Sequence, residues 1–316
     1  MAVAERPGET VCANAIFQQP WWLEAMAPGR WGEATVERDG RIAARMPYVV
    51  RGRPRMRVLT MPPLTQTLGP WIERPEASPP RALGHEHELL AELEAALPPA
   101  AAFIQQFAPT MLNALAFHWA GYRLEIQYTY RLALGGEDEL WQGLRGSIRR
   151  EIRKARGRVE VREDLGLDRF HAVWAKTFSR QGLSPPASLA ELERLDAACA
   201  AHDARAMLFA SDAAGEVHAV AYVIWDANGA FNLLGGADPR LRSSGASSLL
   251  MWESILRAGR VTDVFDFEGS MIGPVERFFR AFGSRQTPYL KVTRGAAARG
   301  VLAARDRLRR VAPQRR

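Results

Sequence analysis

The chain has 316 residues, 47% hydrophobic and 24% charged, so it is globular and long enough for about two domains. No apolar run reaches the roughly 18 residues that a membrane span needs, and the N-terminus MAVAERPGET lacks the apolar stretch of a secretory signal. Cys12 and Cys199 are isolated and the six histidines have no zinc spacing, which excludes a disulfide framework or a zinc site. We therefore expect a cytoplasmic protein that binds no metal.

Positive charge is concentrated in two segments. The tail 294–316 carries eight arginines and one aspartate, and the segment 145–158 carries seven basic residues and one glutamate. Because the whole chain has a net charge of only +7, the rest of it is acidic. Two such patches suit phosphates, nucleic acid or an anionic membrane surface. The tail therefore suggests peripheral contact with the inner face of a membrane.

The first half of the chain, residues 1–136, alternates strand and helix patterns. Residues 33–38 and 41–50 predict a hairpin, because Asp39-Gly40 is a favoured tight turn. Further elements are expected in the order strand 56–61, helix 84–97, strand 101–107, helix 110–120 and strand 122–134. In the loop 62–70, Gln66 offers donor and acceptor groups for an acceptor peptide or sugar, although a plain rigid turn fits equally well.

The second half, residues 137–293, predicts another α/β unit. Its expected order is helix 137–156, strand 158–163, helices 167–181 and 188–202, strands 205–211, 217–226 and 230–236, helix 247–258, strand 263–267, helix 274–282 and strand 288–293. The boundary between the halves is expected within 135–157.

The helix around 145–156 has a buried stripe and a basic face. Leu140, Leu144, Ile148 and Ile152 recur every four residues and predict the buried side. Next to that stripe we expect a basic stripe of Arg145, Arg149, Arg153 and Arg156, and Arg150 and Lys154 form another. Arginine forks match phosphate geometry. A solvated helix face is the alternative. The excess of basic over acidic residues favours contact with phosphate or RNA.

The loop 238–247 joins a strand that ends in Gly235-Gly236 to a helix. Backbone N–H groups at the start of that helix can bind an anion. Arg240 and Arg242 add charge, and Gly245 permits close approach of a ligand. The predicted donor-binding residues are Arg240, Arg242, Ser243, Ser244, Gly245, Ala246 and Ser247. An ordinary helix start capped by Ser243 or Ser244 is the alternative.

The run Phe265-Asp266-Phe267-Glu268-Gly269 predicts a strand with two carboxylates on one face and aromatic residues on the other. Glu268, at the strand end, could orient or deprotonate an attacking amine, so Glu268 and Asp266 are the candidate catalytic residues. Structural ion pairs of these carboxylates with Arg277 or Arg280 are the alternative.

These motifs resemble those of the FemABX family, relatives of the GNAT acyltransferases. Arg242, Gly245 and Ser247 resemble the GNAT pyrophosphate loop Q/R-x-x-G-x-G/A, with serine in the last place. The strand ending at Glu268-Gly269 and the turn Phe278-Phe279-x-x-Phe282-Gly283 resemble the second half of Fem proteins, and Phe17-x-x-Pro20-Trp21-Trp22 resembles their start. The resemblance implies a mixed α/β fold of two tandem GNAT-type domains, 1–136 (degenerate) and 137–293, with a cleft between them and a basic tail 294–316.

The resemblance also implies transfer of an acyl or aminoacyl group to an amine on a peptide, sugar or small molecule, such as a cell-wall or polysaccharide precursor. The donor substrate would be aminoacyl-tRNA or acyl-CoA, with no permanently bound cofactor and no metal. Two alternatives remain open. One is an acyl-CoA-dependent N-acyltransferase of a small molecule. The other is a non-catalytic protein of the same fold that binds nucleic acid or a membrane.

Overall fold

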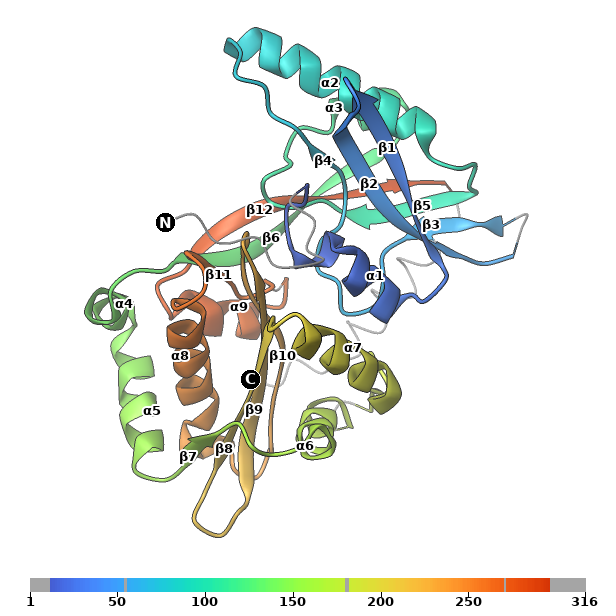
Figure 1. Ribbon diagram of the computed structural model, residues 1–316. Coiled ribbons are helices and arrows are strands. Elements are labelled where there is room, and N and C mark those ends of the chain that lie inside the picture. The colour runs from blue at the N-terminus through green and yellow to red at the C-terminus, as the bar shows by residue number, and fades with distance from the viewer. Residues whose placement is uncertain (1–11, 54–55, 180–181, 270, 296–316) are drawn as a thin grey trace. The chain divides into compact units, whose positions relative to one another are not determined.

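The computed structural model describes residues 12–53, 56–179, 182–269 and 271–295. The chain divides into two compact units, whose elements are shown in Figure 1. The N-terminal unit comprises the described residues up to Gln127 and from Pro288 onward, and the central unit comprises Tyr128–Thr287. Most of the basic tail 294–316, and with it the predicted membrane contact, lies outside the described residues.

The N-terminal unit is a mixed sheet with helices. Its strands are β1 (Trp31–Arg38), β2 (Arg41–Arg51), β3 (Val58–Thr60), β4 (Trp71–Ile72), β5 (Ala102–Gln106), the first part of β6 (Arg123–Ala133) and the last part of β12 (Arg285–Arg294). Its helices are η1 (Ile16–Gln18), α1 (Pro20–Met26), α2 (Pro79–Ala96) and α3 (Leu115–Trp119). The predicted hairpin is confirmed, since β1 and β2 pair antiparallel across Asp39-Gly40, and both turn residues have positive φ. Next in the sheet, β3 is antiparallel to β2 and parallel to β5, and β12 is antiparallel to β5.

The core of this unit lies under α2. Leu89, Leu90 and Leu93 are fully buried, as the helical spacing predicts, and belong to one cluster with Phe103 and Phe117. Proline at the first helical position fixes a helical φ, so α2 begins at Pro79, five residues earlier than predicted. The two-residue strand β4, paired with β2, was not predicted because it is too short to show a hydrophobic period.

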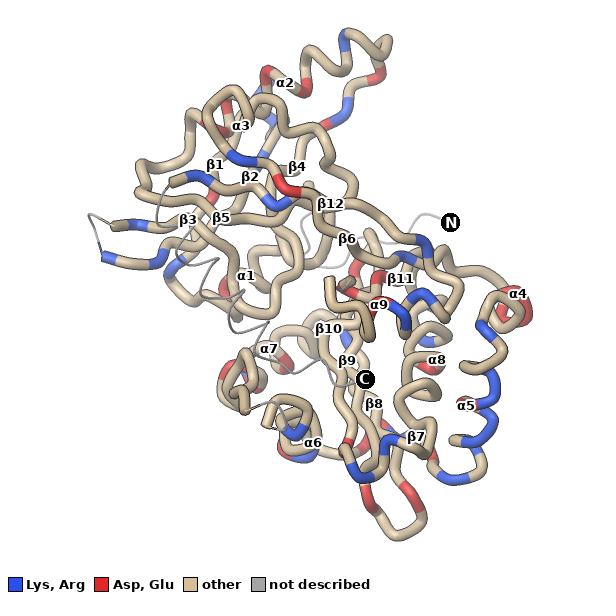
Figure 2. Tube along the Cα trace, turned by 180° about the vertical axis from the view of Figure 1, so that it is seen from behind, with Lys and Arg blue, Asp and Glu red and all other residues tan. Residues whose placement is uncertain are grey.

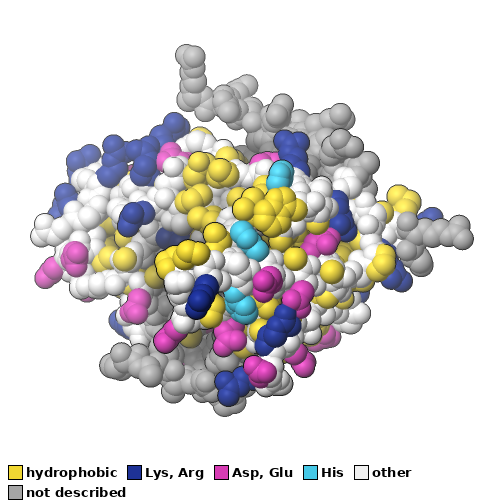
Figure 3. All heavy atoms as spheres, turned by 90° about the horizontal axis from the view of Figure 1, so that it is seen from above, with side chains coloured by type: hydrophobic (Ala, Val, Ile, Leu, Met, Phe, Trp, Pro, Cys, Tyr) yellow, Lys and Arg dark blue, Asp and Glu magenta, His cyan; other side chains and the backbone are white. Residues whose placement is uncertain are grey.

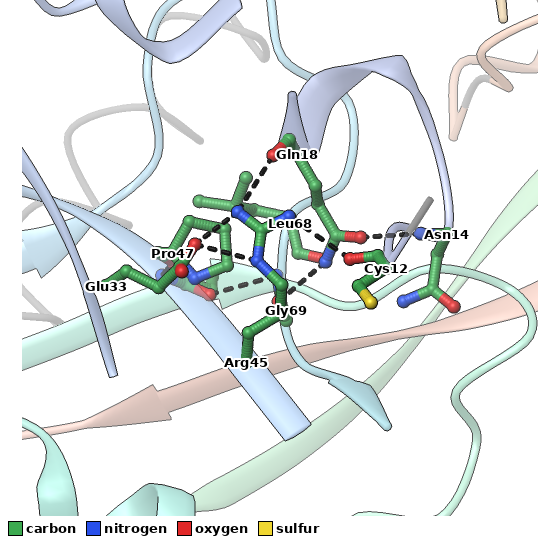
Figure 4. A network of polar contacts seen from close by, with 9 residues as sticks. Cys12, Asn14, Gln18, Glu33, Arg45, Pro47, Leu68 and Gly69 are labelled. Carbon is green, nitrogen blue, oxygen red and sulfur yellow. Dashed lines mark hydrogen bonds and ion pairs between the residues drawn. The ribbon is translucent and has the colours of Figure 1, made fainter. Parts of the chain in front are cut away.

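A buried arginine organises the polar interior of the N-terminal unit (Figure 4). Arg45 on β2 forms an ion pair with Glu33 on β1 and donates hydrogen bonds to the carbonyls of Cys12 and Gln18. Gln18 in turn donates to the carbonyls of Leu68 and Gly69 at 3.0 and 2.9 Å. Because each buried polar group is satisfied by another, the network fixes the loop 62–70 against the N-terminal segment.

The central unit also contains mixed β-sheet and helices. Its strands are the last part of β6, β7 (Glu160–Arg162), β8 (Arg205–Ser211), β9 (Val217–Asp226), β10 (Gly229–Ala237) and β11 (Val264–Asp266), in the order β6-β11-β10-β9-β8-β7. Its helices are α4 (Glu137–Gly143), α5 (Gly146–Arg156), α6 (Leu167–Ser179), α7 (Leu189–Ala201), η3 (Arg242–Ser244), α8 (Ala246–Ala258) and α9 (Gly273–Arg280). β10 and β11 are parallel, and the other neighbours in the sheet are antiparallel.

The predicted single helix 137–156 is wrong, because it is two helices. Leu144 and Arg145 have extended ψ angles of 140° and 144°, which end α4 and make Arg145 the N-cap of α5. The Arg145 N–H donates to the carbonyl of Ala281 at 2.9 Å. A Cβ on Gly283 would lie 3.0 Å from the carbonyl oxygen of Gly143. The turn after α9 therefore packs against the break between α4 and α5. This contact is between residues far apart in the sequence, so a local pattern does not reveal it.

The predicted apolar stripe of α4 and α5 is confirmed. Leu140, Leu144, Ile148 and Ile152 are all buried, in one cluster with residues of α8 such as Trp252. Figure 2 shows that Lys and Arg occupy many of the other positions of α5. In the part of the chain that the structure describes, no helix is long and apolar enough to cross a membrane.

Candidate functional site

The central sheet opens where β10 and β11 diverge. The two strands pair only at Ala230 with Phe265 and Phe231 with Asp266, and β10 continues to Ala237 without β11. Glu268 and Gly269 have positive φ angles of 57° and 53°, which turn the chain away from the strand direction. A Cβ on Gly269 would lie 2.4 Å from the carbonyl oxygen of Tyr128, so only glycine fits this turn.

A cavity of about 780 Å³ lies at this opening. It is within the range of about 300–1,000 Å³ that is typical of small-molecule sites. Its lining comes from β9 and β10, the loop after β10, α6, α8, the turn after β11, and α9: Thr177, Val220, Ala221, Asn232, Leu233, Gly235, Gly236, Ala237, Pro239, Arg242, Ser247, Leu250, Met251, Phe267, Glu268, Gly269, Pro274, Val275, Phe278 and Phe279. All of these residues belong to the central unit.

Glu268 brings a carboxyl group to the cavity wall. Its Oε1 is shielded from solvent and has no hydrogen-bond partner among the described residues. Burial raises the pKa of Glu268 well above its usual range, and the neighbouring Asp266 carboxylate raises that pKa further. A left-handed φ on a residue other than glycine costs about 1–2 kcal/mol, so the fold holds this carboxyl in a strained position. A buried carboxyl with a raised pKa in a cavity is a candidate proton acceptor.

Asp266 is buried behind this turn and is not part of the cavity lining. Its Oδ1 accepts hydrogen bonds from the Thr129 hydroxyl and, at 2.8 Å, from the Glu268 backbone N–H. Its Oδ2 lies 3.7 Å from Arg131 Nε. The ion-pair alternative for these carboxylates therefore involves Arg131, because Arg280 pairs with Glu276 at 2.7 Å. The Asp266 carboxylate thus holds the turn that carries Glu268, and its own catalytic role stays a prediction.

The predicted donor loop contributes two side chains to the cavity. Arg242 and Ser247 line it, and the other five predicted donor residues, Arg240, Ser243, Ser244, Gly245 and Ala246, do not. Arg240 instead forms an ion pair with buried Asp238 at 3.0 Å, and Lys176 on α6 pairs with the same carboxylate at 2.8 Å. Hydrogen bonds from Arg240 and Lys176 hold the pKa of Asp238 well below its usual range. Asp238 therefore anchors the loop where it leaves β10.

Gly245 serves packing in this loop. It is the N-cap of α8, with a φ of 84°, and a Cβ at this position would lie 2.5 Å from the carbonyl oxygen of Glu151 on α5. The structure shows a close approach of the α5 backbone at Gly245, and the predicted approach of a ligand stays a prediction. Neither suggested serine caps α8 by its side chain, although the Ser244 hydroxyl accepts a hydrogen bond from the Ala246 N–H at 3.3 Å.

The basic helix α5 supports the loop from behind. Lys154 donates to the carbonyl of Ser243 at 2.6 Å, and Arg149 donates to the carbonyls of Trp141 and Gln142. Arg153 lies over the Trp141 ring at 5.5 Å, and Arg150 is exposed. None of these four basic residues lines the cavity. Lys154, Arg149 and Arg153 therefore have contacts within the unit, and binding of phosphate or RNA by this helix stays a prediction.

Gln66 belongs to the N-terminal unit, in the loop between β3 and β4, and is half-buried. It is not among the residues that line the cavity of the central unit. Its role in acceptor binding stays a prediction.

The sequence missed most of the cavity wall. Val275, Phe278 and Phe279 on α9 and Leu250 and Met251 on α8 line the cavity, yet in the sequence they are indistinguishable from core residues. The only available signal was the strong amphipathic pattern of 273–280 directly after the candidate carboxylates. Among the described residues, no cluster of His, Cys, Asp and Glu could hold a metal ion.

Comparisons with known proteins agree with this geometry. Residues 142–280 match the acetyltransferase (GNAT) domain family, and no curated protein sequence matches the chain significantly. The structure of FemX superposes with a TM-score of 0.68 at 12% identity, covering 90% of this chain and 93% of FemX. A tandem GNAT protein from the clavulanic acid biosynthesis pathway gives 0.52 at 12% identity, covering 91% and 90%. L-PGS from Bacillus licheniformis gives 0.51 at 11% identity, covering 94% and 90%.

The predicted resemblance to FemABX-like relatives of the GNAT superfamily is therefore confirmed, as is the mixed α/β tandem GNAT fold. Residues 142–280 are similar to the GNAT acetyltransferase domain, which agrees with acyl transfer in general.

Proposed function

We propose that the protein transfers an acyl or aminoacyl group from an activated donor to an amine acceptor. The observation that carries this proposal is the orphaned, shielded carboxyl of Glu268 on the wall of the cavity where β10 and β11 diverge. We assign the reaction to the domain predicted at 137–293, retain 1–136 as its degenerate copy, and keep the cytoplasm as the expected location. The GNAT match over 142–280 supports this assignment.

In the proposed reaction, the acceptor amine attacks the carbonyl carbon of the donor ester or thioester. The Glu268 carboxylate takes a proton from the attacking nitrogen, the new C–N bond forms, and the C–O or C–S bond breaks. The leaving oxygen or sulfur carries away the electron pair and is then protonated. Past Phe231 the β11 side of β10 has no strand partner, so its backbone N–H groups are candidates to stabilise the oxyanion.

The donor's phosphates are proposed to bind at Arg242 and at the start of α8. Arg242 is exposed at the cavity rim, and Ser247 on the first turn of α8 lines the same cavity. A guanidinium fork and a helix N-terminus both favour phosphate oxygens. These features suit acyl-CoA, which GNAT domains use, and equally the 3′ end of an aminoacyl-tRNA.

Replacing Arg242 with alanine is expected to weaken donor binding by tenfold or more. A hydrogen bond to a charged group contributes about 1.5–3 kcal/mol, and each 1.4 kcal/mol corresponds to a factor of ten in Kd. The dissociation constant of CoA, measured by calorimetry, checks the prediction. Arg260→Ala removes one exposed positive charge of the same unit away from the cavity and should leave Kd unchanged. An equal loss of CoA affinity in both variants would show that Arg242 acts only through its general positive charge.

If the donor is aminoacyl-tRNA, the exposed face of α5 should contact its backbone. Each phosphate contact contributes about −0.7 to −0.9 to the slope of log K against log salt concentration. Arg150→Gln with Arg153→Gln is then expected to flatten that slope by up to about 1.8. The titration is run on a chain ending at Gly295, so that the remaining tail arginines do not contribute.

An unchanged slope in the double variant would remove α5 from RNA recognition. RNA binding without transfer would favour the second candidate function, a non-catalytic nucleic-acid-binding protein, which the exposed basic residues of α5 support. The direct test of the proposed reaction is mass spectrometry of product. Candidate amine acceptors are peptides, sugars and small molecules, including cell-wall or polysaccharide precursors, supplied in parallel with charged tRNA and with acyl-CoA. No acylated product from either donor would overturn the proposal.

A further inference from the structure

The cavity lining combines two ionisable side chains with an apolar surface. The last paired residues of β10 and β11 are Phe231 and Asp266, two residues before Glu268. β10 continues six residues beyond Phe231 to Ala237, about 20 Å along the strand, before the loop that carries Arg242 begins. A donor held at Arg242 with its carbonyl at Glu268 therefore lies along this unpaired part of β10. The group beyond the carbonyl must then lie in the remainder of the cavity.

The remainder of the cavity is apolar. Phe267 and three side chains of α9, Val275, Phe278 and Phe279, line it. The apolar surface continues outward, since Met271, Ile272 and Val275 are 57%, 51% and 36% exposed. Exposed residues of this size in a row beside a cavity mark a binding surface more often than a chance arrangement.

The α9 wall is held in place by polar contacts on its other side. The Tyr130 hydroxyl donates to Glu276 at 2.9 Å and accepts from Gln286 at 2.9 Å. Arg280 forms an ion pair with the same Glu276 carboxylate. Phe278 also packs on Phe279 and Phe282, and Phe279 packs on Phe267. The apolar surface is therefore preformed, which reduces the entropy cost of binding a flexible chain.

The charges of the lining argue against an aminoacyl group. Arg242 and Glu268 are the only ionisable residues among the described residues that line the cavity. An aminoacyl donor would place an α-ammonium group next to its carbonyl, and burying that charge requires a carboxylate partner. Glu268 cannot both neutralise that ammonium and accept the proton of the attacking amine. No second carboxylate lines the cavity to take either role.

We propose that the transferred group is an apolar acyl chain of medium to long length, lying against Phe267 and the α9 wall. The inference rests on the proposed function for its chemistry, but the binding preference that it predicts can be measured without any transfer.

Affinity for a series of S-alkyl-CoA thioethers tests the proposal. Ethyl, butyl, hexyl and octyl thioethers cannot transfer their chain, so calorimetry reports binding alone. Each buried methylene contributes about 0.8 kcal/mol, so Kd is expected to fall about fourfold per methylene. The gain should end where the chain reaches the exposed residues Met271 and Ile272. An affinity that is flat or falls with chain length would overturn the proposal, as would the absence of saturable binding throughout the series.

A variant of the α9 wall locates the preference. Val275→Glu changes a partly exposed residue, so folding should be retained, and it is expected to abolish the gain with chain length while ethyl-CoA still binds. The matched control is Leu83→Glu, because Leu83 is 48% exposed and lies on α2 of the N-terminal unit. Exposed hydrophobic side chains are not confined to the cavity, since Figure 3 shows several gathered on one face of the molecule. The Leu83→Glu control should keep the full chain-length dependence. Loss of the dependence in the control alone would place the chain elsewhere and overturn the proposal.

Failure of this inference is distinct from failure of the proposed function. Transfer of an acetyl or aminoacyl group together with a flat thioether series would overturn the acyl-chain inference and keep the transferase. A steep thioether series without transfer to any amine would keep the acyl-chain site and overturn the transferase.

Discussion

Glu268→Gln is expected to lower turnover by about 100-fold or more, with little effect on donor affinity, because general base catalysis typically contributes about 10²–10⁴. Glutamine keeps the shape and the left-handed turn but cannot accept the amine proton. Steady-state rates at saturating donor, together with the donor dissociation constant, separate the two effects.

The pH dependence of the same pair of proteins identifies the proton acceptor. Burial and Asp266 raise the pKa of Glu268, so the active carboxylate forms only as the pH rises through that raised pKa. The wild-type rate should therefore increase with pH above the usual glutamate range, and this limb should be absent in Glu268→Gln. The stability of the fold should change with pH in the opposite direction to the rate. The raised pKa favours the folded state below the ordinary pKa of glutamate, and this contribution is lost as the pH rises through the raised value. The glutamine variant should therefore be at least as stable as the wild type at neutral pH.

Glu216→Gln is the matched control, because Glu216 is an exposed glutamate in the turn between β8 and β9 of the same unit. It should keep both the rate and the pH limb. Wild-type turnover in Glu268→Gln would show that substrate positioning, rather than proton transfer to this carboxyl, supplies the rate.

The fold was predictable wherever local periodicity and packing agree. The leucines of α2, the four-residue stripe of Leu140 to Ile152 and the Asp39-Gly40 hairpin encode their structure within a few residues. The break at Leu144 was not predictable, since the stripe continues through it without a gap. Its cause is the turn at 281–283, more than 130 residues away in the sequence. Contacts of this kind override a continuous helical pattern.

The site was predictable only in its polar groups. Glu268 and Arg242 were recognisable from their positions at a strand end and before a helix, and both line the cavity. The different surroundings of Asp266 and Glu268 could not be inferred, because strand alternation places both on one face. The positive φ of Glu268 ends that alternation and separates the two carboxylates, one facing the cavity and one buried behind it. The sequence also could not predict whether the space at Gly245 is occupied by a ligand or by another part of the chain, such as α5.

Gly245→Ala is expected to destabilise the central unit by about 2–5 kcal/mol. The left-handed φ of 84° costs any L side chain about 1–2 kcal/mol, and overpacking typically adds about 1–3 kcal/mol. Overpacking applies here because the added Cβ would lie 2.5 Å from the Glu151 carbonyl oxygen, a backbone atom of α5 that cannot move without the helix. Chemical denaturation measures the loss in the free energy of unfolding.

Gly215→Ala separates the two contributions to that loss. Gly215 has nearly the same φ, 81°, in the turn between β8 and β9, but nothing lies within 4 Å of the Cβ that it would gain. This control should lose only the conformational part, about 1–2 kcal/mol, so the difference between the two variants measures the contact with α5. The folded Gly245→Ala variant should also bind the donor more weakly, because α5 and the Arg242 loop meet at this glycine. Equal losses of stability in the two variants would show that α5 yields to the added methyl group, and Gly245 would then be needed only for its backbone conformation.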